Sequence, residues 1–359
     1  MEGVISLGVG EPDFVTPERF REAAIRSIKE GRTKYTSNYG ILPLRQAISE
    51  HTTRLRGVTY DPEGEILVTV GVSEAVDLAL RATLNEGDEV IIADPSYVAY
   101  VPGIVLAGGV PVPVPTEEAH DFRLRPEDVE RAITPRTRAI LLGFPNNPTG
   151  AVLTAADLGG LARLAEEHDL LVYADEIYDR LVYGGEHRSI VSLPGMRERT
   201  VYLAGFSKSY AMTGWRVGYA CAPGEVIEQM MKIHQYSVMC VPTAAQYAAL
   251  EALRTGEDEV RRMVAEYDRR RTVMWRRFNE LGLHCFEPRG AFYCFPNITS
   301  TGMADEEFAE RLLVQEKVVT VPGNAFGERG RGHVRACYAT SLEKIEEACD
   351  RIARFVGRV

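Results

Sequence analysis

A lysine surrounded by small and aromatic residues is the strongest chemical signal in the sequence. Lys208 lies within FSKS (206–209), directly after a predicted strand, and Arg216 follows it on the C-terminal side. Desolvation and a nearby cation lower the pKa of an ammonium group, which frees the neutral amine to act as a nucleophile. The stretch therefore predicts a lysine that forms a Schiff base with a carbonyl compound. An exposed surface lysine is the plain alternative.

Two polar side chains near other predicted strand ends complement this amine. Asn147 lies in the loop PNNPTG (145–150), where its amide would face a ligand oxygen or simply belong to a proline-rich loop. Asp175 ends a buried strand within VYADEIY (172–178), at the edge where open α/β sheets bind ligands. An aspartate at that place could equally be the N-cap of a helix.

An anion site is predicted where Gly71, Val72 and Ser73 end one strand and open the next helix. The first N–H groups of a helix have no partner within it, and they lie at its positive end, so they attract a phosphate. Ser73 could also serve as an ordinary N-cap, and the two roles are compatible.

Short apolar runs alternate with amphipathic stretches through the middle of the chain, which is the pattern of βα units. These units would bring the candidate residues together at one edge of a largely parallel sheet, buried on both faces and covered by helices. Helices are predicted at 73–84, 125–132 and 154–168, and strands at 65–70, 89–93, 110–114 (read as buried), 137–143, 170–174, 201–204 and 217–221.

The pattern changes after about residue 253, where a long charged helix is predicted at 256–281. Strand-like stretches follow it, and a last helix is predicted at 342–355. With 359 residues the chain is long enough for about two domains, so a smaller α+β domain is expected at the C-terminal end. Its strand-like stretches are 284–286, 291–295, 318–321 and 332–338.

Composition excludes several classes of protein. The 41 basic and 51 acidic residues leave a formal net charge of −10, which disfavours binding to nucleic acid or to anionic membranes. The six cysteines are widely spaced without a CxxC, so we expect reduced, mostly buried thiols and no metal site. The N-terminus has no basic region followed by an apolar stretch, and the uncharged run at 97–116 is rich in proline and glycine. We therefore expect a cytoplasmic protein.

At this point the chain resembles the class I/II aminotransferases of fold type I, which use pyridoxal 5′-phosphate (PLP), and in particular the aspartate and aromatic amino acid aminotransferases. The motifs that carry the resemblance follow one another along almost the whole chain: GVGEPDFVTP, KYTSNYGILPLRQAI, VTVGVSEA, DPSYVAY, PNNPTG, YADEIYDRLVY, FSKSYAMTGWRVGY and HVRACYATS.

The resemblance implies the fold and the assembly. The expected fold is the type I PLP-dependent transferase fold, with a mostly parallel, seven-stranded sheet between helices in a large domain at 33–254. A smaller α+β domain would comprise 1–32 and 255–359. The protein would form a homodimer whose active sites are shared between subunits.

The resemblance also implies roles for the candidate residues. Lys208 would form the Schiff base with PLP and later move the proton between the substrate and the cofactor. Asp175 would pair with the pyridine nitrogen and keep it protonated, so that the ring withdraws electrons. Tyr178 and Asn147 would hydrogen-bond the phenolic oxygen.

The other cofactor contacts implied are at the ring faces and at the phosphate. The aromatic ring of Tyr97 would stack on one face of the pyridine ring and Ile177 would lie on the other. The phosphate would be held by Gly71, Val72, Ser73, Ser207 and Arg216, and by Tyr35 of the partner subunit.

Substrate recognition requires a cation for the α-carboxylate of an amino acid. Arg335, in HVRACYATS, matches the bidentate arginine of the family, and the backbone of Gly10 would assist it. A surface ion pair is the plain alternative, but an unpaired charge inside so apolar a stretch would be costly.

The reaction expected is ping-pong transamination between an L-amino acid and a 2-oxo acid such as 2-oxoglutarate. Some enzymes of the subgroup that act on acidic substrates have a lysine where Ser73 stands, so neutral or aromatic donors are favoured, with aspartate-like ones still open. The chain also begins almost at its first strand, without the N-terminal segment usual in the family. The sequence therefore does not predict how the site closes over the substrate. A PLP-dependent carbon-sulfur β-lyase and a non-catalytic PLP-sensing domain are the alternatives, although the acidic charge disfavours a DNA-binding regulator.

Overall fold

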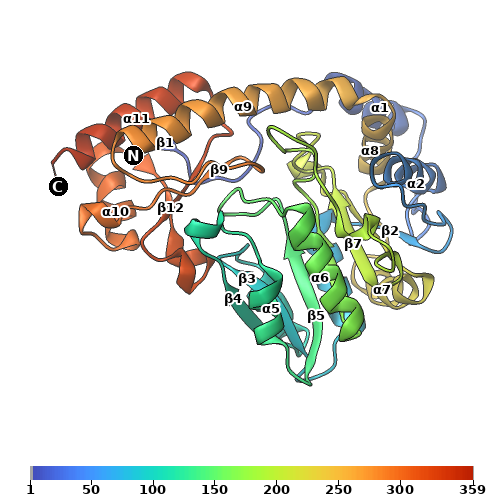
Figure 1. Ribbon diagram of the computed structural model, residues 1–359. Helices are drawn as coiled ribbons and strands as arrows, with labels where there is room; N and C mark the ends of the chain where they lie inside the picture. Colours follow the sequence, from blue (N-terminus) through green and yellow to red (C-terminus); the bar gives the residue numbers. More distant parts are fainter. Residues whose placement is uncertain (1–2, 359) are drawn as a thin grey trace.

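Seven strands form the main sheet of the computed structural model, which describes residues 3–358 (Figure 1). All neighbours pair in parallel except β8, which is antiparallel to both β2 and β7, so the predicted mostly parallel, seven-stranded sheet is confirmed. In spatial order the strands are β2 (Ile66–Thr69), β8 (Gly218–Cys221), β7 (Thr200–Gly205), β6 (Leu171–Asp175), β5 (Thr137–Gly143), β3 (Glu89–Asp94) and β4 (Val110–Pro115).

Helices cover both faces of this sheet because successive side chains of a strand point in opposite directions. Along β6, Tyr173 packs in the cluster beneath α3 (Gly71–Thr83), α4 (Tyr100–Leu106) and α7 (Gly224–Ser237). Val172 and Ala174 pack on the other face, beneath α5 (Pro126–Ala132) and α6 (Ala155–Glu167). Further along that face, a third cluster joins α1 (Glu18–Lys29), α2 (Leu42–Arg56) and α8 (Thr243–Thr255) to β2, β7 and β8.

The prediction that residues 110–114 form a buried strand is wrong in one respect. The strand β4 exists, but it lies at the edge of the sheet, and Val110 is 44% exposed while only Val114 is buried. Proline cannot donate a hydrogen bond to a neighbouring strand, so Pro111, Pro113 and Pro115 are tolerated only at such an edge.

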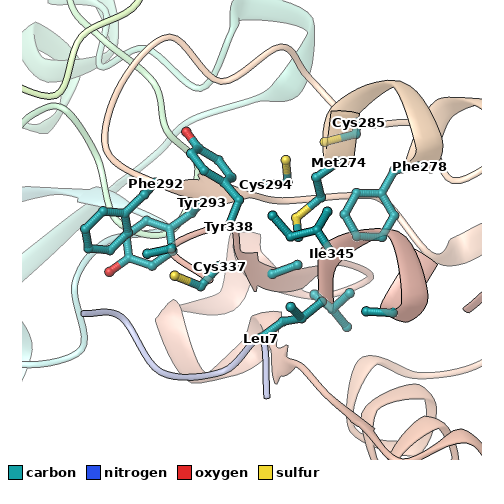
Figure 2. Packing of buried hydrophobic residues seen from close by; sticks show 14 of the residues in the cluster. Leu7, Met274, Phe278, Cys285, Phe292, Tyr293, Cys294, Cys337, Tyr338 and Ile345 are labelled. Atoms are coloured by element: carbon teal, nitrogen blue, oxygen red, sulfur yellow. The ribbon is translucent and has the colours of Figure 1, made fainter. Parts of the chain in front are cut away.

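The C-terminal part packs around its own apolar cluster (Figures 1 and 2). Helix α9 (Glu257–Glu280) runs along one side of the molecule from α1 and α8 to α11 (Leu342–Val356). The strands β11 (Val321–Pro322), β12 (Val334–Cys337) and β9 (Tyr293–Cys294) form a small antiparallel sheet, while β1 (Ile5–Ser6) pairs with β10 (Val318–Val319) near α10 (Asp305–Glu316).

The strand predicted at residues 284–286 does not form, although these residues are described in full. The backbone N–H of Cys285 donates to Asn279, and its carbonyl accepts from the indole of Trp275 and from the Asn279 amide. Side chains of α9 therefore satisfy the backbone groups that a neighbouring strand would otherwise bond.

All six cysteines are free thiols, and five of them are buried while Cys240 is partly exposed. The expectation that the thiols are mostly buried is confirmed. Within residues 3–358, none of the helices has both the length and the apolar character needed to span a bilayer.

Candidate active site

A cavity of about 780 Å³ lies at the carboxyl ends of the parallel strands, where the main sheet meets the C-terminal part. The structure brings most of the predicted site residues to its walls. They are Gly10, Val72, Ser73, Tyr97, Asn147, Asp175, Ile177, Tyr178, Ser207, Lys208, Arg216 and Arg335.

Lys208 follows β7, and its ammonium group donates a hydrogen bond of 2.7 Å to the carbonyl of Gly10. Burial is the main cause that lowers the pKa of Lys208 to about 8, and Arg216 and Arg335 add to the effect. The acidic side chain of Glu11 opposes it. The lysine is therefore closer to a neutral amine than a surface lysine is.

Asp175 ends β6, and burial raises the pKa of its carboxyl group to about 6. Two donors limit this rise. The hydroxyl of Tyr100 donates to Oδ2 over 2.8 Å, and the backbone N–H of Ile177 donates to Oδ1 over 3.2 Å. The carboxylate is thus held in one orientation toward the cavity that it lines.

The sequence motifs do not assign Tyr100 to the site. It is buried, at 5% exposed, but it also bonds to Asp175 and lines the cavity. A Cβ atom at position 143 would lie 2.3 Å from the Tyr100 hydroxyl oxygen, so Gly143 makes room for it. Because this pairing crosses from α4 to β6, the spacing along the chain carries no signal for it.

Arg335 is buried in β12, where its hydrogen-bond partners are neutral oxygens. It donates to the Asn147 side chain over 2.8 Å and to the carbonyl of Gly8 over 2.6 Å. Its Nε has no hydrogen-bond partner within the described chain. The guanidinium carbon lies 4.4 Å from the ring centre of Tyr293 and 5.0 Å from that of Phe326. Arg335 is 7% exposed and both partners are neutral, so within residues 3–358 it does not form the surface ion pair considered above.

The start of α3 forms a cationic corner of the cavity. Gly71 has a φ of +73°, and a Cβ atom there would lie 2.3 Å from Nη2 of Arg216. The guanidinium therefore lies against the turn. Ser73 is the third residue of α3 and Val70 occupies the N-cap position, so Ser73 is not an N-cap.

The two residues predicted to enclose the cofactor ring, Tyr97 and Ile177, both line the cavity. Tyr97 is 36% exposed and packs edge-on against Tyr100, with 5.5 Å between the ring centres. Tyr35 is 80% exposed and lies outside the residues that line the cavity of its own chain.

Comparison with known proteins identifies the family. The profile of the family described as aminotransferase class I and II matches residues 2–352. A putative aminotransferase of Bacillus subtilis (strain 168), YugH, is 51% identical over 100% of this chain and 93% of its own. Aromatic-amino-acid aminotransferase 2 of Thermococcus litoralis is 48% identical over 99% and 92% of the two chains. The crystal structure of an aromatic aminotransferase from Pyrococcus horikoshii OT3 has a TM-score of 0.98, with 46% identity over 100% and 96% of the chains.

The chain belongs to the class I and II aminotransferases, of the type I fold. It is a PLP-dependent transaminase. The residues of the cavity fit this cofactor on chemical grounds. An amine with a pKa of about 8 suits its aldehyde, a buried carboxylate suits its ring nitrogen, and Arg216 beside a helix N-terminus suits its phosphate.

Proposed function

We propose that Lys208 supplies the amine that would bond to the aldehyde carbon of PLP with loss of water. Once the amine of the substrate has displaced it, the free Lys208 amine would carry a proton to and from the substrate Cα. One observation carries this proposal: a partly buried amine, a buried carboxylate and a buried, incompletely partnered arginine line the same cavity. Burial lowers the pKa of Lys208 to about 8, so a substantial share of the amine is neutral near physiological pH.

The remaining side chains would hold the cofactor. When bound, PLP supplies an electron-withdrawing ring that stabilises the charge left after the Cα proton departs. Asp175, fixed by Tyr100, would keep the ring nitrogen protonated, while Tyr178 and Asn147 would bond the phenolic oxygen. Tyr97 and Ile177 would lie against the ring faces. The phosphate would be held by Gly71, Val72, Ser73, Ser207 and Arg216.

Arg335 would bind the α-carboxylate of the amino acid. Nη1 donates to Asn147, Nη2 donates to the carbonyl of Gly8, and Nε has no partner, so the guanidinium keeps donor capacity for a two-point contact with a carboxylate. The backbone of Gly10, whose carbonyl accepts from Lys208, would border the same subsite.

The substrate class we propose is a neutral or aromatic L-amino acid, with a 2-oxo acid such as 2-oxoglutarate completing a ping-pong cycle. Ser73 offers no cation for a distal carboxylate, and Val9, Val321 and Phe326 give the cavity apolar walls. The names of similar proteins include aromatic-amino-acid and aspartate aminotransferases, so aspartate is the second candidate.

We also propose a homodimer with shared active sites. An apolar patch at the mouth of the cavity supports it: Val98, Val101, Val105 and Leu106 are 48%, 45%, 55% and 69% exposed. Contiguous apolar surface of this kind is typical of protein interfaces. Tyr35, exposed in its own chain, would reach the phosphate of the partner's site.

We also propose a cytoplasmic location and a division of the chain into two domains. The six free thiols support a reducing, cytoplasmic location. The division into 33–254 and into 1–32 with 255–359 is supported by the apolar cluster of the C-terminal part, most of whose residues belong to the second group. Tyr178 and Tyr183 also join this cluster, and α1 packs on α8.

The experiment that tests the proposal is a half-reaction without any 2-oxo acid. An L-amino acid alone should convert bound PLP to its amino form and release one 2-oxo acid for each site, because the amino group stays on the cofactor while water supplies the oxygen of the product. A β-lyase would instead release ammonia and leave the cofactor unchanged.

A further inference from the structure

Tyr293 lines the cavity, but neither the sequence motifs nor the roles proposed above include it. It lies in β9, is 1% exposed, and its hydroxyl oxygen is 2.7 Å from the hydroxyl oxygen of Tyr178. Figure 2 shows Tyr293 beside Phe292 at one end of the apolar cluster, away from Phe278 and Cys285. A buried phenol that bonds to another phenol at the edge of an active site calls for an explanation.

The backbone around the pair makes room for the Tyr293 hydroxyl. A Cβ atom at position 10 would lie 2.3 Å from this oxygen, so any residue other than glycine would displace it. The carbonyl of the same residue, Gly10, accepts the hydrogen bond from Lys208. The hydroxyl of Tyr293 therefore sits next to the anchor of the reactive lysine as well as next to Tyr178.

The hydroxyl groups of Tyr178 and Tyr293 each have one proton to donate. Burial holds the pKa of both Tyr178 and Tyr293 above the ordinary value of a phenol, so both stay protonated at neutral pH. Either oxygen could donate in the bond between them. Tyr178 has one proton, and it can donate that proton into the cavity only if it accepts the proton of Tyr293.

We propose that Tyr293 is a positioning residue, whose hydroxyl donates to Tyr178 and thereby directs the proton of Tyr178 toward the phenolic oxygen of PLP. This inference rests on the proposed role of Tyr178. The donor chain then runs from Tyr293 to Tyr178 to the cofactor. A chain of donors polarises each successive O–H group, so the negative charge on the phenolic oxygen is better stabilised.

The ring of Tyr293 performs a second, separable function. The guanidinium carbon of Arg335 lies 4.4 Å from the centre of this ring, which is within the range of a cation–π contact. The ring therefore supports the arginine that would bind the substrate carboxylate. The hydroxyl serves the cofactor and the ring serves the substrate, so different substitutions separate the two.

The charged and titratable groups that act on the pair come from three places in the fold. Arg335 and Cys337 belong to β12 and act on both phenols, while Tyr97 acts on Tyr293 from the loop before α4. Lys208, after β7, has its Nζ 6.0 Å from the ring centre of Tyr178. None of them is removed by a substitution at position 293, which keeps the experiment interpretable.

The first measurement follows the absorption of bound PLP against pH in Tyr293→Phe. Loss of the donor makes the negative phenolic oxygen less stable, so the bound cofactor holds its proton to higher pH. The midpoint should rise by about 0.5–1 pH unit, the effect of one hydrogen bond. Affinity for 3-phenylpropionate, or for maleate if the wild type does not bind the former, should stay within about twofold because the ring remains.

Tyr293→Leu removes the ring as well. It should show the same spectral shift and also bind the carboxylate about threefold to tenfold more weakly. Tyr183→Phe is the matched control: its buried hydroxyl donates to the carbonyl of Ala291 over 2.6 Å and does not line the cavity. This variant should keep the wild-type midpoint and affinity.

A double variant separates this inference from the proposed function. In a Tyr178→Phe background, Tyr293→Phe should cause no further shift, because it acts through Tyr178. An unchanged midpoint in Tyr293→Phe, or a shift that persists without Tyr178, overturns the inference while the proposed function stands. If the wild-type protein shows no pH-dependent PLP absorption, the proposed function and this inference both fail.

Discussion

Burial acts on two oppositely charged groups of the site with the same result. It lowers the pKa of Lys208 to about 8 and raises that of Asp175 to about 6, so both groups are shifted toward their neutral forms. The neutral amine can then bond to an aldehyde, and a protonated ring nitrogen would stabilise the charged form of the buried carboxylate.

The shift at Asp175 predicts a trade between stability and catalysis. Its pKa rises from 3.8 to about 6, so the folded PLP-free protein binds the proton more tightly than the unfolded chain. This contribution to stability is present at low pH and is lost as the pH rises through that range. At pH 8 the charged form therefore costs on the order of 3 kcal/mol.

Asp175→Asn should make the PLP-free protein more stable at pH 8, by about 1–2 kcal/mol after the loss of one donor contact, and turnover should fall about a hundredfold or more. Urea unfolding at pH 5 and pH 8 measures the first effect, and the gain should shrink at the lower pH. If the variant had the same gain in stability at both pH values and near-normal turnover, the role of Asp175 would be purely structural.

The sequence predicts the elements that carry the catalytic residues better than the contacts between them. The apolar pattern locates β5, β6 and α3 because the spacing of the apolar residues and the length of each segment indicate the same type of element. It does not reveal the bond of Tyr100 to Asp175 or of Tyr293 to Tyr178, since these partners are distant in sequence and meet only after folding.

The two wrong strand predictions have the same origin, because the local sequence does not show which neighbours a segment will have. The apolar content of residues 110–114 does not show whether a strand lies at the centre or at the edge of a sheet, and only the prolines indicate the edge. The predicted strand at 284–286 is replaced by bonds to Trp275 and Asn279 of α9, which local pattern cannot reveal.

The turn before α3 supports a prediction about the phosphate. Gly71→Ala introduces a Cβ atom at a φ of +73° and 2.3 Å from Arg216, so the guanidinium must move. PLP should bind about tenfold more weakly or worse, a loss of about 1.4 kcal/mol, whereas pyridoxal, which lacks the phosphate, should bind almost as before. Titration of absorption gives both dissociation constants.

Gly159→Ala in α6 is the control, because a Cβ atom there meets nothing within 4 Å. It should leave both affinities unchanged and raise stability by up to about 1 kcal/mol, since alanine favours a helix. Equal weakening of PLP and pyridoxal in Gly71→Ala would mean that the turn supports the fold and not the phosphate.

At the scale of the whole molecule, the site depends on parts that are far apart in the sequence. Gly10 comes from the N-terminal segment, Lys208 from the end of β7 and Arg335 from β12, and α9 connects the two parts of the molecule (Figure 1). The apolar patch formed by Val98, Val101, Val105 and Leu106 borders this site, which is why we propose it as part of a dimer interface.

Mixed dimers test the shared site. Tyr35→Ala and Lys208→Ala subunits carrying different affinity tags are co-expressed, and the mixed species is purified. If Tyr35 serves the partner's phosphate, one site carries both defects and the other carries none, so the mixed dimer should retain about half of the wild-type activity per dimer.

If Tyr35 instead served its own subunit, every site would lack one group, and activity would not exceed the average of the two parent variants. A monomer in sedimentation at working concentration would contradict the shared site directly. A variant with both Val105→Glu and Leu106→Glu should lose the apolar patch. Unlike the wild-type protein, it should be a monomer and bind PLP more weakly.

Transamination at Lys208 is tested most directly by a stopped-flow half-reaction of the PLP-loaded protein with single L-amino acids. We predict complete conversion of bound PLP to its amino form with one equivalent of 2-oxo acid, faster with phenylalanine or leucine than with aspartate. Lys208→Ala should bind PLP without a borohydride-reducible link and show no conversion. Unchanged cofactor with release of ammonia, or conversion by Lys208→Ala at the wild-type rate, would contradict transamination at this lysine.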